Sequence, residues 1–237
     1  MRTLRKHGYG FNAIACEPRE WEILQKVNEA HFEGSTRSYG VHPMVAGNIT
    51  EADWERLESL LGNYPEAGVG ECGLDKRYDG YADENGGLGI QERAFRRQAE
   101  LARDYRRDLQ IHCVGDYGRI IRILDECGFP GKKSGFGTQK NAQQVHAVFH
   151  RFGGDISIVK SAQGLNPIYS LHLDSFRKKS TLAAIPHIPA EQIRFETDAD
   201  ENFVAAHHLL KNEPVEKIAQ ILIEQLEETE QLVFRSR

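Results

Sequence analysis

The sequence lacks the features of membrane and exported proteins. It has no run approaching the roughly 18 apolar residues that a membrane helix needs, and its first residues, MRTLRKHGYG, lack the apolar core of a signal peptide. We therefore expect a cytoplasmic protein that has no membrane partner. It also lacks a linker rich in proline, glycine and serine, so we expect one domain over residues 1–237.

Cysteine is scarce, and its spacing does not indicate a metal site. The four cysteines show no Cys-x-x-Cys pair, and they are Cys16, Cys72, Cys113 and Cys127. Without a secretory context, such cysteines are more often reduced thiols than disulfides or zinc ligands.

Positive charge is in deficit. The 30 lysines and arginines against 35 acidic residues give a net charge of -5. This balance argues against a broad basic surface for gripping nucleic acid. It does not exclude a phosphoester substrate, because bound divalent cations reverse the field of an acidic pocket.

Short apolar runs alternate with amphipathic stretches along most of the chain. Strands are predicted near residues 10–16, 38–41, 67–71, 109–113, 144–150, 168–173 and 193–196. Helices are predicted over 18–30, 50–61, 90–107, 116–127 and 214–228. Such alternation is typical of an α/β fold of the TIM-type (β/α) barrel, although seven strands are one fewer than a closed barrel needs.

One segment, residues 155–173, is ambiguous. The residues ISIVK have the β-branched content of a strand. The order of a barrel instead requires a helix there, followed by a strand over 168–173, and we adopt that assignment.

Four potential metal ligands recur at the ends of predicted strands: Glu71, His112, His150 and Asp198. They are separated by 41, 38 and 48 residues, each about one strand with its crossover helix. Alone, each has a simpler explanation as a helix cap or a satisfied core histidine. Because strand tips of a parallel barrel share one pocket, their joint occurrence favours a site for one or two divalent ions, Mg, Mn or Zn.

Other polar residues are assigned by their place in the predicted barrel. His42 follows a short strand in the phrase GVHP and is a pocket candidate, whereas His146 lies four residues before His150 and is interpreted as structural. Arg177 and Lys178 follow a strand tip, which favours phosphate contacts. Six arginines on the 90–107 helix indicate a solvated outer face instead.

Three loop and cap assignments complete this interpretation. We expect the polar loop KRYDGYADENGG to cover the pocket, Asp116 to cap the following helix, and residues 131–143 to lie on the opposite, non-catalytic face.

The sequence motifs at these strand ends resemble those of the TatD family of metal-dependent deoxyribonucleases, within the amidohydrolase-like barrel hydrolases. The matching phrases are GVHP at 40–43, VGECGLD at 69–75, ELA at 100–102, IHCVGDYG at 111–118, HRFGG at 150–154 and IPAEQIRFETDAD at 188–200, with Gln91 and Phe95 between them. The likeness extends from about residue 10 to 230.

The resemblance implies metal-dependent hydrolysis of DNA phosphodiesters, often from a 3′ end. It implies that Glu71 bridges two metal ions and that His112 and His150 bind one of them. It also implies that Asp198 binds the other and is the general base for the attacking water. The substrate-binding candidates are His42, Arg151, Arg177 and Lys178.

The chain departs from the family at its start. The family begins with a strand that carries Asp-x-His-x-His, and these residues contain no such motif. The missing motif coincides with the missing eighth strand. We expect either that this chain starts at an internal methionine or that the lineage has lost that strand, which would impair one metal site.

Two other functions remain open at this point. One is a barrel hydrolase of a small amide or ester, although many such relatives use a carboxylated lysine where this chain has glutamate. The other is a non-catalytic protein that kept the scaffold and lost its metals.

Overall fold

The computed structural model describes residues 2–83, 86–131, 145–199 and 215–236, which form two compact units. The larger unit takes its described residues from 12–150 and 160–168. The smaller unit takes them from 2–11, 151–159, 169–199 and 215–236. The expectation of one domain stays a prediction, as does the placement of residues 131–143, nearly all of which lie outside the described residues.

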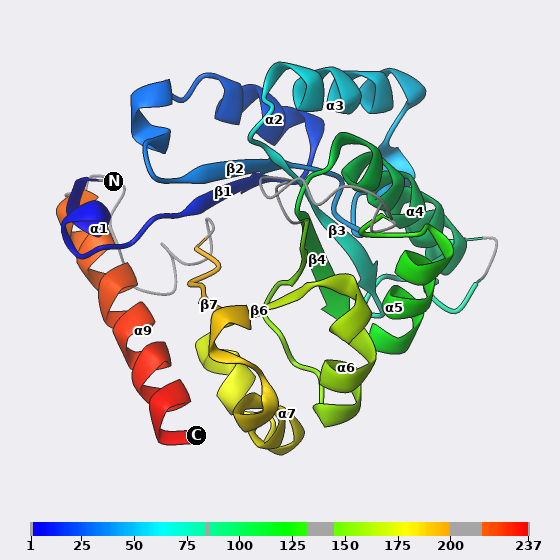
Figure 1. Ribbon diagram of the computed structural model, residues 1–237. Coiled ribbons are helices and arrows are strands. Elements are labelled where there is room, and N and C mark those ends of the chain that lie inside the picture. The colour runs from blue at the N-terminus through cyan, green and yellow to red at the C-terminus, as the bar shows by residue number, and fades with distance from the viewer. Residues whose placement is uncertain (1, 84–85, 132–144, 200–214, 237) are drawn as a thin grey trace, which may run out of the picture. The chain divides into compact units, whose positions relative to one another are not determined.

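Seven parallel strands follow one another in chain order, as predicted (Figure 1). The larger unit contains β1 (Asn12–Ala15), β2 (Thr36–Tyr39), β3 (Gly68–Asp75), β4 (Leu109–Val114) and β5 (Ala147–Phe149), each hydrogen-bonded to the next. In the smaller unit, residues of β6 (Pro167–Leu171) pair with β7 (Ile193–Phe195).

Helices separate these strands. The α-helices are α1 (Arg2–Lys6), α2 (Pro18–Gln25), α3 (Glu51–Asn63), α4 (Gly87–Tyr105), α5 (Tyr117–Glu126), α6 (Ile156–Ser161), α7 (Lys179–Ala184) and α9 (Val215–Ser236). Short 3-10 helices cover Glu29–Phe32, Ala46–Asn48, Ala162–Leu165, Leu173–Phe176, Ile185–His187 and Ala190–Gln192. In the part of the chain that the structure describes, none of the helices combines the length and the hydrophobicity of a membrane-spanning segment.

The core of the larger unit lies between β1–β3 and helices α2–α4. Trp21, Tyr39 and Leu57 are fully buried in it. The indole of Trp21 donates to the carbonyl oxygens of Ala15 and Gly40, which ties α2 to the ends of two strands. Apolar residues on one face of each helix account for this packing, because burying that face stabilises an otherwise marginal helix.

Local signals explain where several elements begin and end. Thr50 caps α3 in a reciprocal box with Asp53, as predicted. Helix α2 ends at Gln25, short of the predicted residue 30, because Asn28 accepts from the amide of Ala30 and starts a separate 3-10 turn. The ambiguous segment is helix α6 followed by strand β6, as assigned.

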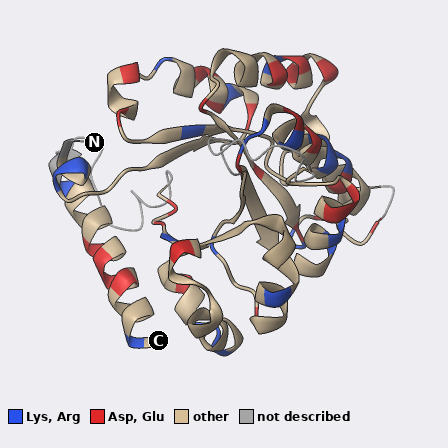
Figure 2. Ribbon diagram, viewed as in Figure 1, with Lys and Arg blue, Asp and Glu red and all other residues tan. Residues whose placement is uncertain are grey.

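Charges of both signs alternate on the outer helices of the larger unit, as Figure 2 shows for α3 and α4. Arg97 pairs with Glu51, and Arg96 pairs with Glu126. Their arginine side chains are 38% and 37% exposed. These two arginines are partly exposed and each is paired with an acidic side chain, which fits the solvated outer face that the sequence predicts.

Candidate metal centre

Glu71 lies inside β3 and not at its tip. The prediction that the strand ends at this carboxylate is wrong, because β3 continues to Asp75. The register of β3 against β4 shifts between Val69 and Cys72, so a bulge carries Glu71 out of the regular ladder. The residue is buried, with 8% of its surface exposed.

The imidazole of His112, from β4, lies between two carboxylates. Its Nδ1 is 2.7 Å from Oε1 of Glu71, and its Nε2 is 2.9 Å from Oδ2 of Asp75. Asp75 is completely buried at the end of β3. The two carboxylates therefore fix the orientation of the ring.

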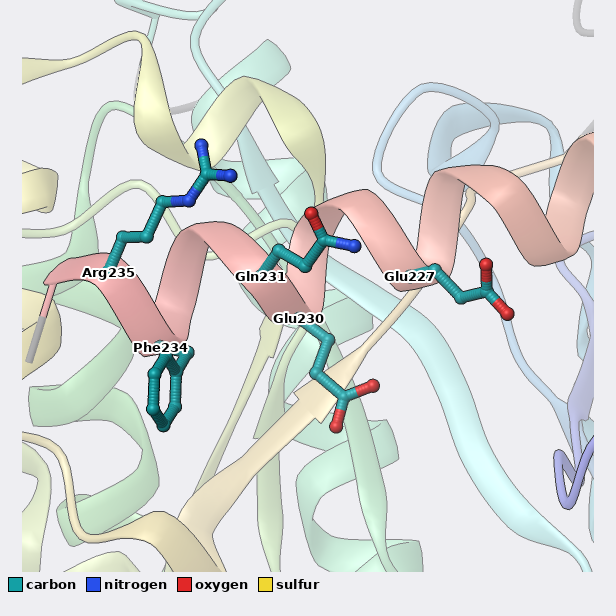
Figure 3. A pocket seen from close by; sticks show the side chains of 5 residues that line it. All are labelled: Glu227, Glu230, Gln231, Phe234 and Arg235. Atoms are coloured by element: carbon teal, nitrogen blue, oxygen red, sulfur yellow. The ribbon is translucent and has the colours of Figure 1, made fainter.

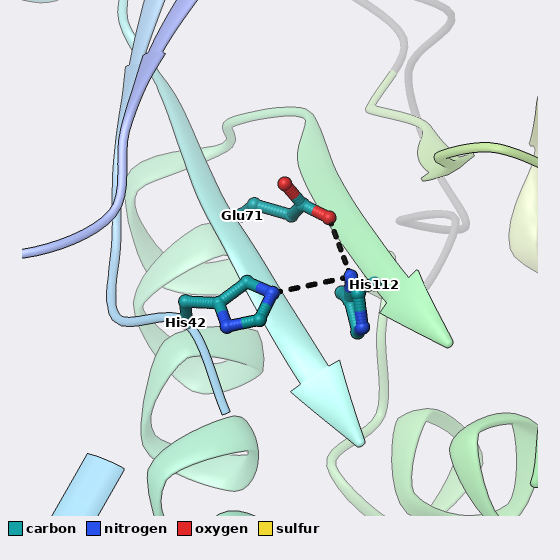
Figure 4. A group of neighbouring side chains, drawn as sticks. All are labelled: His42, Glu71 and His112. Carbon is teal, nitrogen blue, oxygen red and sulfur yellow. Dashed lines mark hydrogen bonds and ion pairs between the residues drawn. The ribbon is translucent and has the colours of Figure 1, made fainter. Parts of the chain in front are cut away.

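Two further histidines face this pair. Nε2 of His42 lies 3.2 Å from Nδ1 of His112, and Figure 4 shows the ring of His42 and the carboxylate of Glu71 both directed at His112. His150 follows β5 directly and places its Nε2 3.6 Å from Oε1 of Glu71. Three of the four predicted ligands therefore lie together in the larger unit.

The tautomer of His42 follows from its second nitrogen. The backbone amide of Met44 donates to Nδ1 of His42 over 3.2 Å. A neutral ring that accepts at Nδ1 carries its proton on Nε2, the nitrogen that faces the centre. His42 is thus arranged to donate a hydrogen bond there.

Buried glutamines of α4 position two of these groups. Gln98 accepts from the amide of Val41 and donates to its carbonyl, which holds the backbone beside His42. Gln91 makes the same pair of bonds with the backbone of Asp75. The two glutamines are 1% exposed or less, and their spacing of seven residues places them on one face of the helix.

Close backbone contacts around Glu71 require glycine. A Cβ on Gly40 would lie 2.4 Å from the Cα of Gly70, and one on Gly73 would lie 1.9 Å from the carbonyl oxygen of His112. Gly73 also has a φ of +148°, which L residues with side chains rarely adopt. These glycines let β3 approach its neighbours closely on both sides of Glu71.

The ionisable side chains of this site shift one another's pKa values. Burial lowers the pKa of His112, but hydrogen bonds to Asp75 and Glu71 outweigh it, so the net pKa is raised above 6.5. Burial raises the pKa of Glu71, yet the neighbouring His150 and His112 bring it below its usual value. Burial and the charge of His112 lower the pKa of His42 to about 4, so His42 is neutral at pH 7.

The donor set fits a divalent cation. The ligand atoms of His42, Glu71 and His112 all lie within 4.8 Å of one another. Two ligand atoms bound at about 2.1 Å to one ion are about 3.0–3.4 Å apart in octahedral or tetrahedral geometry. The 2.7 Å and 3.6 Å separations from Glu71 to His112 and His150 bracket that range. Small side-chain movements would therefore create a coordination shell.

The fourth predicted ligand, Asp198, lies in the smaller unit and is paired with a cation of the chain itself. Nη1 of Arg151 donates to Oδ2 of Asp198 over 2.7 Å, and Nη2 of Arg151 contacts Asp174. The amide of Arg151 also donates to Glu196. The role of Asp198 as metal ligand and general base stays a prediction.

The remaining predicted substrate contacts are also in the smaller unit. Arg177 is 82% exposed and pairs with Asp174 at 2.7 Å. Nζ of Lys178 donates to the carbonyl oxygen of Gly153. Their contact with phosphate, like that of Arg151, stays a prediction.

Asp116 does not cap α5 as predicted. Its side chain makes no cap hydrogen bond and instead lies 3.4 Å from the hydroxyl of Tyr81 and 3.8 Å from Nζ of Lys76. Lys76 and Tyr81 both belong to the loop that follows β3, whose covering of the pocket stays a prediction. A contact from a distant segment has thus replaced the local cap.

A surface hollow elsewhere has no comparable chemistry. It lies along one face of α9 and is lined by Glu227, Glu230, Gln231, Phe234 and Arg235 (Figure 3). These side chains come from a single helix and include no histidine or cysteine. The converging ligands of the larger unit therefore identify the better candidate site.

Sequence reasoning missed Asp75, Gln91 and Gln98 as parts of the site. Their signal is polarity on a buried face: both glutamines interrupt the apolar stripe of α4, and Asp75 is the last residue of a buried strand. Buried polar groups are nearly always hydrogen-bonded, so each such residue indicates a specific partner.

Comparisons with known proteins identify the family of this chain. The sequence matches the family described as TatD related DNase over residues 2–235. It is 30% identical over 175 residues to the 3′-5′ ssDNA/RNA exonuclease TatD of Cronobacter sakazakii, covering 71% of this chain and 58% of that protein. The chain thus spans less than two thirds of that relative's length.

Two further relatives extend the match. The chain is 27% identical over 210 residues to the uncharacterized metal-dependent hydrolase TatD of Mycobacterium tuberculosis, covering 86% of this chain and 74% of that protein. A crystal structure of a TatD homologue from Escherichia coli K12 superposes with a TM-score of 0.68 at 19% identity, covering 99% and 87% of the two chains. The chain belongs to the family described as TatD related DNase.

Proposed function

We propose that this chain is a metal-dependent phosphodiesterase that acts on single-stranded DNA or RNA. The convergence of Glu71, His112 and His150 next to His42 carries the proposal, because it supplies anionic and neutral nitrogen ligands within coordinating distance. The names of the exonuclease relatives support the substrate class. We assign the metal ligands as Glu71, His112 and His150.

A divalent cation supplies a Lewis acid that activates water and neutralises charge on phosphoryl oxygens. Mixed imidazole and carboxylate ligands suit Zn or Mn better than Mg, which prefers oxygen. Asp75 accepts from Nε2 of His112, so Nδ1, the nitrogen that faces Glu71, is the one that would bind the cation.

His42 has a different role in this proposal. Its neutral ring presents Nε2–H toward the centre, so it donates to a phosphoryl oxygen of the substrate and stabilises charge that grows there. Asp198 remains our proposed general base, on the resemblance alone. Arg151, Arg177 and Lys178 remain proposed phosphate contacts.

The experiment is cleavage of a labelled single-stranded oligonucleotide with and without Mn. We expect Mn-dependent release of nucleotides by the wild-type chain and loss of that activity in Glu71→Gln. The matched control is Glu51→Gln, an exposed carboxylate of α3, which should leave cleavage unchanged. Wild-type protein that is loaded with metal but does not cleave would overturn the proposal and favour a non-catalytic scaffold. Hydrolysis of small esters or amides without cleavage of nucleic acid would favour the other alternative.

A further inference from the structure

We propose that Arg77 binds a backbone phosphate of the nucleic acid beside the metal centre. The inference rests on the proposed function and deepens it, because it names a substrate contact in the larger unit that the sequence did not single out. Arg77 is the second residue after β3, the strand that carries Glu71 and Asp75.

A buried carboxylate fixes the guanidinium of Arg77. Nε of Arg77 lies 3.0 Å from Oδ1 of Asp75, and Nη2 lies 2.6 Å from Oδ2. The backbone amide of Arg77 also donates to Oδ1 over 2.8 Å. Bidentate pairing of this kind orients the planar group and leaves little rotational freedom.

The opposite edge of the same guanidinium faces solvent. The side chain of Arg77 is 67% exposed, although its partner Asp75 is fully buried. Among the described residues, no group accepts a hydrogen bond from Nη1 of Arg77. Oriented donors therefore remain for an external anion, and the planar fork of arginine matches a phosphodiester.

Arg77 and the metal ligand His112 share one carboxylate. Oδ2 of Asp75 accepts from Nη2 of Arg77 and from Nε2 of His112, so the guanidinium lies two hydrogen bonds from the imidazole. A phosphate held by Arg77 would consequently lie close to the reacting one.

A second cation adjoins Arg77. The side chain of Lys76 is 47% exposed, and its Nζ is 3.8 Å from Asp116, a loose pairing. Its aliphatic part lies across Gly115, where an added Cβ would be 2.8 Å from Cδ of Lys76. Lys76 thus adds positive charge at the ends of β3 and β4.

A purely structural role would be to neutralise Asp75. The backbone amide of Arg77 and the ring of His112 already donate to that carboxylate. Arg97 provides the comparison, because it also pairs with a carboxylate, Glu51, with both distances under 3.0 Å, but lies on outer helix α4.

The test measures steady-state cleavage of a labelled oligothymidylate with Mn over a range of salt concentrations, for wild type, Arg77→Gln and Arg97→Gln. Glutamine keeps a donor for Asp75 and removes the charge. We expect Arg77→Gln to raise KM about fivefold with kcat unchanged. Loss of one phosphate contact should also make the slope of log(kcat/KM) against log salt shallower by about 0.7. Arg97→Gln should match wild type.

The outcomes are distinguishable. If Arg77→Gln has the wild-type KM and salt slope, Arg77 does not bind phosphate, and the proposed function stands. If Arg77→Gln lowers Mn affinity and kcat without changing the salt slope, it only supports Asp75 and His112, and the inference is overturned. If wild type shows no cleavage that Glu71→Gln removes, the proposed function fails and this inference fails with it.

Discussion

Oδ2 of Asp75 lies 2.9 Å from Nε2 of His112, which makes Asp75 the positioning residue for a metal ligand. Such a carboxylate raises the basicity of the ring and fixes its tautomer. We predict that Asp75→Asn lowers the affinity for Mn or Zn by about 10–100-fold while the fold is retained. Isothermal titration calorimetry measures the affinity. Asp125→Asn, at an exposed position of α5, is the control, and equal affinity in the two variants would refute the role.

Substitutions of His42 and His150 should change different quantities, kcat in the first case and Mn affinity in the second. If His42 donates to substrate and His150 binds metal, His42→Asn lowers kcat by about 100-fold with Mn affinity nearly unchanged. His150→Asn should lower the Mn affinity itself. Kinetics and metal titration on both variants check this assignment. If His42→Asn loses Mn binding and His150→Asn keeps it, the assignment is wrong, and His42 is the metal ligand.

Metal binding should release a proton from His112. Its pKa is raised, so below that pKa the ring carries a proton on Nδ1, beside Glu71, that a cation must displace. Below that pKa, we expect Mn affinity to rise about tenfold per pH unit, with about one proton released per ion. Titrations in two buffers of different ionisation enthalpy count the proton. A pH-independent affinity between about pH 5.5 and 6.5 would be the contrary result.

Protonation of His42 should make the stability of the metal-free protein depend on pH. The folded-state pKa of His42 is about 4, below the unfolded value of 6.5, so the unfolded state binds more protons between these pH values. The unfolding free energy of wild type relative to His42→Asn should therefore fall as pH drops through this window, by on the order of 1 kcal/mol per pH unit. Urea unfolding in EDTA measures it. The same difference at pH 4.5 and 7 would argue against a buried neutral His42.

Gly73 should not tolerate a side chain. A Cβ there would overlap the carbonyl oxygen of His112 at 1.9 Å, on a backbone with φ of +148°. We expect Gly73→Ala to lower the unfolding free energy by about 3 kcal/mol or more. Gly62→Ala is the control: it is in helix α3 with open space around it, and it should stabilise by about 0.5–1 kcal/mol. Equal stability of the two variants would show that β3 and β4 can separate at this point.

Much of the fold could be predicted from the sequence, because hydrophobic periodicity and turn residues are local features of the chain. The seven strands, the capping box of Thr50 and the grouping of Glu71 with His112 and His150 all follow from apolar runs and their spacing. When each successive parallel strand carries one ligand near its carboxyl end, the ligands lie together, because those ends share one edge of the sheet.

The rest depends on contacts between distant segments, which leave no periodic signal. The bulge that places Glu71 inside β3 is a property of its pairing with β4. The pairing of Asp198 with Arg151 joins residues 47 positions apart. Similarly, Asp116 binds Tyr81 instead of capping its own helix.

The most direct test of the account is the amount of divalent metal bound by the chain after loading with Mn or Zn and dialysis, measured by elemental analysis. In the described residues, one group of potential ligands converges, and the carboxylate of Asp198 is paired with Arg151. We therefore predict about one equivalent in wild type and less than about a tenth in Glu71→Gln. Less than about a tenth of an equivalent in wild type, or equal metal content in the two proteins, would contradict the claim that Glu71 and its histidines form a metal centre.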